Sequence, residues 1–118
     1  MWDNYITLAV QISNTLTKQG AKFYSGLVRS HDSFYTEAED EICAYWSKRG
    51  ILGADMETGA LLTLGRLRGV QVAAILCNVV EYQADLEESI GEYKNSAELL
   101  AYSEYQASLA ALSTLTSY

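Results

Sequence analysis

The chain has 118 residues, of which 49% are hydrophobic and 19% charged, a composition that predicts one globular domain over residues 1–118 and excludes a disordered chain. The formal net charge is −7 with only 8 Lys and Arg, which argues against a nucleic-acid partner because neutralising phosphates needs clustered cations. No apolar run reaches about 18 residues, so no membrane span is expected. Cys43 and Cys77 are isolated, and we interpret them as reduced thiols of a cytoplasmic protein.

The N-terminal part of the sequence predicts a helix followed by a strand. Asp3 is placed to cap a helix that continues to about Lys18, and Gly20 is its expected stop. Residues 22–28 are predicted to form a strand. A polar loop follows at 29–35.

The next helix has signals at both ends. Thr36 and Glu39 have the spacing of a capping box, and acidic residues fill the first turn, where they complement the helix dipole. Lys48 and Arg49 lie in the last turn, and Gly50 follows as the residue that ends the helix.

Two more strands are predicted on either side of a third helix. Residues 51–54 are mostly apolar and too few for a helix. Residues 57–68 predict a helix with a leucine at every third position, and Gly69 ends it. Residues 70–80 are nearly all apolar, as expected of a strand covered on both faces. An acidic loop, 81–92, follows.

The last helix begins near Asn95, which has capping-box spacing to Glu98. One face carries Leu99, Tyr102, Tyr105, Leu109 and Leu112. Helices and strands therefore alternate throughout, which predicts an α/β fold with helices on the faces of a sheet. Ligands of such sheets bind beyond the C-terminal ends of the strands, and three loops are expected there: 29–36, 54–57 and 78–82.

The triplet Asp55-Met56-Glu57 lies where a predicted strand turns into a helix. A carboxylate in that position projects from the end of a sheet and accepts hydrogen bonds from two neighbouring hydroxyls, as on a sugar. The alternative for Glu57 is an ordinary acidic residue in the first turn of a helix. The alternative for Phe34 is a core aromatic, and for Glu81 a solvated loop acid.

Three blocks of the sequence resemble a known family: Ser-His-Asp-Ser-Phe-Tyr-Thr at 30–36, Gly-Ala-Asp-Met-Glu-Thr-Gly-Ala at 53–60, and Ala-Ile-Leu-Cys-Asn-Val-Val-Glu at 74–81. In order and separation they are similar to the C-terminal half of nucleoside phosphorylases, the family that includes uridine phosphorylase and the hexameric bacterial purine nucleoside phosphorylases. The resemblance covers at least residues 20–82. It implies a partial phosphorylase-like three-layer α/β/α sandwich.

The resemblance also implies roles for five residues. Phe34 would pack against the nucleobase, Met56 would border the ribose, and Glu57 would accept hydrogen bonds from the ribose hydroxyls. Asp55 would join them as a substrate-binding residue, at a position where the family usually has Glu. Glu81 stands near the position of an acid that protonates the leaving base in purine-specific members.

The implied reaction is phosphorolysis of a nucleoside to free base and ribose 1-phosphate, with phosphate as co-substrate and no cofactor or metal. His31 is the only histidine, and one His beside Asp32 does not make a metal site. Uridine-specific members carry a Gln and an Arg where this chain has Ala38 and Asp40. An Asp cannot donate to a uracil carbonyl, so a purine nucleoside is slightly favoured.

The resemblance does not extend to the family's N-terminal half, which holds the glycine-rich phosphate loop. The isolated chain is therefore expected to be inactive alone and to form a homo-oligomer or associate with the missing half. An incomplete sheet would also leave an apolar edge to cover. Two other functions remain open: a hydrolytic nucleosidase of the same fold, and a non-catalytic oligomeric relic.

Overall fold

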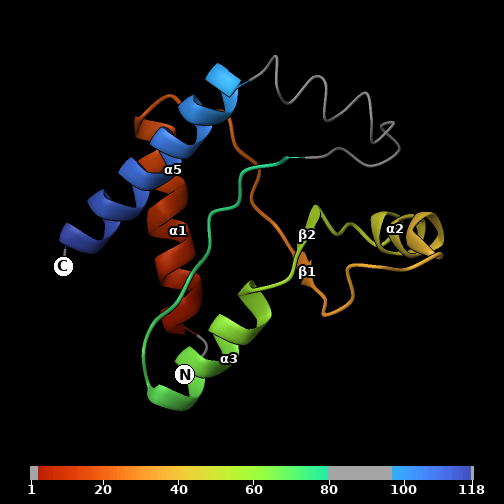
Figure 1. The fold of residues 1–118 in the computed structure, drawn as a ribbon. Helices are drawn as coiled ribbons and strands as arrows, with labels where there is room; N and C mark the ends of the chain where they lie inside the picture. Colours follow the sequence, from red (N-terminus) through yellow and green to blue (C-terminus); the bar gives the residue numbers. More distant parts are fainter. Residues whose placement is uncertain (1–2, 80–96, 118) are drawn as a thin grey trace. The chain divides into compact units, whose positions relative to one another are not determined.

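The computed structural model describes residues 3–79 and 97–117 (Figure 1). The chain divides into two compact units: Met1–Phe23 together with Ala73–Tyr118, and Tyr24–Val72. The single domain predicted over residues 1–118 stays a prediction.

The first unit is built on two helices that lie side by side, α1 (Asp3–Lys18) and α5 (Ala97–Thr116) (Figure 1). Their contact is small: Leu8 and Leu16 of α1 are each 6% exposed, and Ala110 of α5 is fully buried. Each buried leucine contributes about 1.5–3 kcal/mol by leaving water. The pair is therefore held by few apolar side chains.

Polar contacts add to this helix pair. The hydroxyls of Thr15 and Thr114 lie 3.5 Å apart, and Thr114 is only 2% exposed. Beyond the end of α1, Gln19 Nε2 donates to the backbone oxygen of Gln106 at 3.1 Å. Small residues of α5 thus face α1, while the apolar side chains predicted to share one face of α5 are at the surface: Leu99, Tyr102, Tyr105, Leu109 and Leu112.

The second unit has the order β1 (Val28–Ser30), α2 (Glu39–Ser47), β2 (Gly53–Asp55) and α3 (Thr58–Arg68). The two strands are parallel and α2 lies in the connection between them, so this part of the chain is a βαβ unit. β2 leads almost directly into α3 (Figure 1).

The register of the sheet fixes what lies at its end. Val28 pairs with Gly53, and Ser30 pairs with Asp55. His31 extends the ladder by one more bond, its N–H donating to the backbone oxygen of Asp55 at 3.0 Å. The loops that follow Ser30 and Asp55 therefore leave the same edge of the sheet, its C-terminal edge.

The predicted helix stops are confirmed. Gly20, Gly50 and Gly69 have φ angles of 69°, 80° and 68°, in the left-handed region that a side chain disfavours. After α3, the N–H of Val70 donates to the oxygen of Gly65 at 2.9 Å, which satisfies a carbonyl at the helix end.

The predicted N-cap of α2, Thr36, lies two residues too early. The helix begins at Glu39 with Ala38 as its N-cap and without a side-chain cap, although its first turn is acidic as predicted. The Thr36 hydroxyl instead accepts a 3.2 Å hydrogen bond from the Ala38 N–H, one step before the helix. The second predicted capping box, at Asn95, lies outside the described residues.

The strands of the structure differ most from the predicted ones. Of residues 22–28 only Val28 is in a strand, and the strand predicted at 51–54 is shifted to Gly53–Asp55. The described part of the strand predicted at 70–80 is neither helix nor strand, so that prediction is wrong for 70–79. An apolar run specifies burial, whereas a strand also needs the backbone groups of a neighbour.

Helices and short parallel strands in one chain confirm an α/β class, and the three-layer sandwich stays a prediction. A two-stranded sheet is marginal in isolation. The leucine stripe of α3 is exposed: Leu61 by 54%, Leu64 by 52% and Leu67 by 77%. Among the described residues, no helix combines the length and apolarity needed to cross a bilayer.

Candidate functional site

Four residues meet where the sheet ends and α3 begins, and we call them the Ser30–Asp55 cluster: Ser30, Asp55, Thr58 and Gly59. The Ser30 hydroxyl donates to Asp55 Oδ1 at 2.5 Å. The N–H of Thr58 donates to Asp55 Oδ2 at 2.8 Å, and the Thr58 hydroxyl contacts the same oxygen. The N–H of Gly59 in turn donates to Ser30 Oγ at 2.7 Å.

The hydrogen bonds of the cluster favour the ionised form of Asp55. Burial raises the pKa of this carboxyl, but the hydrogen bonds from Ser30, Thr58 and the backbone of Glu57 outweigh burial and hold the pKa below its ordinary value of 3.8. The carboxylate also stands beside the first N–H groups of α3, where the helix dipole favours negative charge. Whether Asp55 also touches a ligand stays a prediction.

Glu57 is the N-cap residue of α3 and is exposed. Its Oε2 accepts a hydrogen bond from the N–H of Met56 at 3.1 Å. Within the described part of the chain no other protein donor reaches this carboxylate, so most of its acceptor positions face solvent. Met56 is 38% exposed beside it. This carboxylate can accept hydrogen bonds from two hydroxyl groups of an incoming ligand.

Phe34 lies four residues beyond the end of β1. The ring is 73% exposed and packs edge-on against Tyr35, with ring centroids 5.1 Å apart. A shallow, open depression is lined by Phe34, Tyr35, Thr36 and Glu37. Neither Met56 nor Glu57 lines that depression, so a pocket shared by Phe34 and Glu57 stays a prediction.

The fifth predicted site residue, Glu81, lies outside the described residues. Its role as a general acid stays a prediction.

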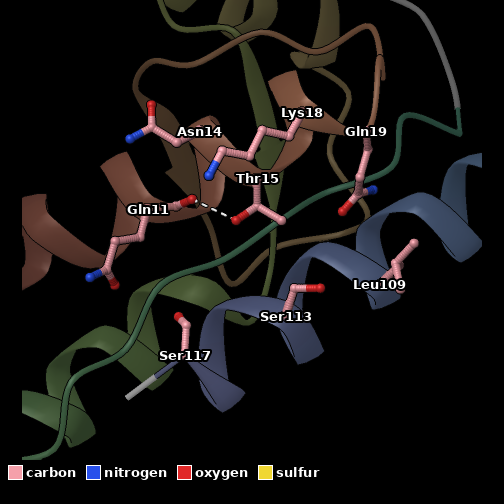
Figure 2. A pocket seen from close by; sticks show the side chains of 8 residues that line it. All are labelled: Gln11, Asn14, Thr15, Lys18, Gln19, Leu109, Ser113 and Ser117. Carbon is pink, nitrogen blue, oxygen red and sulfur yellow. Dashed lines mark hydrogen bonds between the residues drawn. The ribbon is translucent and has the colours of Figure 1, made fainter.

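A second hollow lies in the other unit, in the groove between α1 and α5 (Figure 2). It is lined by Gln11, Asn14, Thr15, Lys18, Gln19, Leu109, Ser113 and Ser117. In Figure 2 the Thr15 hydroxyl donates to the backbone oxygen of Gln11, at 2.9 Å. Lys18 is the one charged residue in this lining, so the groove offers no carboxylate to a sugar.

No role was predicted for the side chains and N–H groups that bind Asp55. Ser30, Thr58 and Gly59 all lie inside the motif blocks. The spacing of the blocks along the sequence does not show which of their residues contact Asp55 in the folded chain. One signal was available: an Asp three residues before the first helical N–H groups is a common way to satisfy them.

The described residues contain no group of three or more His, Cys, Asp or Glu side chains that could hold a metal ion. Cys43 and Cys77 are both free. The chemistry available in the described residues at the end of the sheet is thus that of carboxylates, hydroxyls and backbone N–H groups.

A family model and individual proteins match this chain, whereas solved structures do not. The model of the phosphorylase superfamily matches residues 5–112. A DeoD-type purine nucleoside phosphorylase of Clostridium novyi (strain NT) is 43% identical over 58 residues, which are 49% of this chain but only 24% of that relative. No solved structure gives a significant match. Because the superfamily match extends over nearly all of the sequence, and the βαβ unit with its acidic strand end agrees with it, the chain belongs to the phosphorylase superfamily.

Proposed function

We propose that this chain binds the sugar and base of a nucleoside as part of a nucleoside phosphorylase. Glu57 accepts hydrogen bonds from the two ribose hydroxyls, Met56 borders the sugar, and Phe34 packs on the base. The observation that carries the proposal is the pairing of Ser30 with Asp55 in the parallel sheet. Because of this pairing, the loop that contains Phe34 and the loop that contains Glu57 both begin at the C-terminal edge of the sheet, where ligands of such sheets bind.

The proposed reaction is phosphorolysis, in which phosphate displaces the base and forms ribose 1-phosphate. As the glycosidic bond lengthens, positive charge develops on the sugar, and the nearby Glu57 carboxylate stabilises it. Glu81 protonates the departing base as a general acid. Phosphate enters as co-substrate, and the chemistry needs no cofactor.

A purine nucleoside is the proposed substrate. The matched relative is a purine nucleoside phosphorylase, and over the matched stretch the chain shares 43% of its residues. Asp40 supports the same choice, because an Asp side chain accepts hydrogen bonds and does not donate to a uracil carbonyl as an Arg would.

The sheet is proposed to be completed by further strands, which would make the three-layer α/β/α sandwich. Two three-residue strands do not form a stable sheet on their own. Leu27 at one end of β1 is 71% exposed and Leu52 before β2 is 56% exposed, so apolar surface is available beside the sheet. A second copy of the chain or a complementary phosphorylase half would supply the strands, and the chain alone is then inactive.

The function is tested by incubating the purified chain with inosine, adenosine or uridine, with and without phosphate. Binding is followed by NMR titration, and base release by chromatography. Binding of a purine nucleoside that weakens about tenfold or more in Glu57→Gln supports the proposal. Base release that needs no phosphate would indicate a hydrolytic nucleosidase instead. Absence of nucleoside binding at millimolar concentration would refute the proposed function.

A further inference from the structure

The carboxylate of Asp55 is committed to contacts inside the chain. An ionised carboxylate offers about four acceptor positions. Three are taken by the Ser30 hydroxyl and by the N–H and hydroxyl of Thr58. The backbone of Glu57 also hydrogen-bonds to the same group. Little of Asp55 is left to contact a ligand, so its effect on a ligand has to pass through these neighbours.

The hydroxyl of Ser30 is committed in the same way. It donates to Asp55 and accepts from the N–H of Gly59, so one small side chain connects the ends of both strands to the first turn of α3. The approach is close: a Cβ added at Gly59 would lie 2.9 Å from Ser30 Cβ. Contacts of this kind leave the helix start little freedom to shift relative to the sheet.

The two residues that follow Asp55 are therefore held from both sides. Asp55 stands at the end of β2, Thr58 is the first residue of α3, and only Met56 and Glu57 lie between them. Glu57 has φ −118° and ψ −36°, and its carboxylate is hydrogen-bonded to the N–H of Met56. The direction of the Glu57 side chain follows from where this short loop is held.

We propose that Ser30 and Asp55 are positioning residues, which fix the Met56–Glu57 loop and thereby aim the Glu57 carboxylate at the ribose hydroxyls. The ligand part of this inference rests on the function proposed above. Positioning affects affinity most where one carboxylate must form hydrogen bonds to both hydroxyls of a diol at once. A small displacement of such a binding group lowers the affinity by a large factor.

The test uses Ser30→Ala, which removes the hydroxyl, and Ser30→Thr, which keeps it. Ser103→Ala is the matched control, because the Ser103 hydroxyl donates only to the Leu99 oxygen of its own helix, in the other unit. Asp55→Asn is a second, independent variant that keeps the shape of the side chain and removes its charge. Each variant is checked for folding by circular dichroism.

Two quantities are measured by NMR in every variant. The first is the hydrogen-exchange rate of the Thr58 and Gly59 amides, whose acceptors are Asp55 and Ser30. The second is the affinity for inosine. In Ser30→Ala we expect exchange at Gly59 to accelerate about tenfold or more and inosine affinity to fall about tenfold, with both restored by Ser30→Thr and unchanged in Ser103→Ala.

The outcomes separate this inference from the function on which it rests. Unchanged amide exchange in both Ser30→Ala and Asp55→Asn overturns the inference, because the loop is then held by something else. Faster exchange with wild-type inosine affinity also overturns it, since the cluster is then a structural cap only. A wild-type chain that binds no nucleoside overturns the proposed function, while amide exchange still decides whether the cluster fixes the loop.

Discussion

Substituting alanine for Gly59 tests the closest contact at the candidate site. An alanine Cβ would stand 2.9 Å from Ser30 Cβ and 3.3 Å from Ser30 Oγ, and the nearer distance is shorter than real Cβ contacts allow. Either β1 or the first turn of α3 must move. The hydrogen bond from the Gly59 N–H to Ser30 Oγ, now 2.7 Å long, would lengthen as a result.

The magnitude follows from three terms. Overpacking at a tight contact costs about 1–3 kcal/mol, and the weakened hydrogen bond about 1 kcal/mol more. Replacing glycine by alanine in a helix returns at most about 1 kcal/mol. Gly59→Ala should therefore destabilise the fold by about 1–3 kcal/mol, which lowers Tm by roughly 5–15 °C in a domain of this size.

Gly53→Ala is the matched control for this substitution. Gly53 lies in β2, a Cβ there would meet nothing within 4 Å, and its φ is not in the left-handed region. We expect Gly53→Ala to leave Tm unchanged or slightly raised. Both variants are followed by circular dichroism on heating. A Gly59→Ala chain that melts at or above Gly53→Ala would contradict the close contact between α3 and β1.

Three further predictions concern the contact between α1 and α5, the stability of the fold at acid pH and the reactivity of the Cys43 thiol. Leu16 is 6% exposed, so Leu16→Ala should lower the free energy of unfolding, measured by urea denaturation, by about 2–4 kcal/mol. Leu112 is 62% exposed, and Leu112→Ala should lower it by less than about 0.5 kcal/mol. Equal losses in the two variants would contradict the α1–α5 contact. The folded pKa of Asp55 is lowered, so its stabilisation is present above the unfolded pKa and is lost as pH falls through the folded pKa. Tm should therefore fall on acidification less steeply in Asp55→Asn than in wild type, and parallel profiles would count against the cluster. Burial raises the pKa of the Cys43 thiol, and the hydrogen bond and negative charge of Glu39 raise it further. Glu39→Gln should therefore speed alkylation of Cys43 at pH 8 by about two- to fivefold, measured by mass spectrometry. An unchanged rate would contradict the contact between Cys43 and Glu39.

Local signals in the sequence predicted the structure correctly where a single residue determines the backbone conformation. Gly50 and Gly69 were recognised as helix stops, and both adopt the left-handed conformation that ends a helix. The helices α1, α3 and α5 were predicted from apolar residues that recur over ten or more positions, a long signal in which single errors matter little. The nine-residue helix α2 was predicted from the signals at its ends.

The strands were harder to predict, because whether a segment pairs as a strand also depends on a second segment of the chain. Residues 70–79 are apolar enough for a buried strand, yet Val70 is 56% exposed and Val79 55% exposed in the structure. A strand forms only where a neighbour offers matching N–H and C=O groups. The sequence of one segment does not contain that neighbour.

The candidate site was predictable in part for the same reason. Asp55, Met56 and Glu57 were found because a short acidic motif between strand and helix is visible in sequence. Ser30 was not given a role, because its contact with Asp55 crosses 25 residues of chain and depends on the strand register.

The binding of the ribose hydroxyls by Glu57 is the central claim, and a crystal of the chain soaked with inosine tests it most directly. We expect the ribose 2′- and 3′-hydroxyls within about 3 Å of the Glu57 carboxylate oxygens, with the purine against the Phe34 ring. A ribose bound elsewhere on the chain, with Glu57 still turned onto the Met56 N–H and open to solvent, would contradict the account.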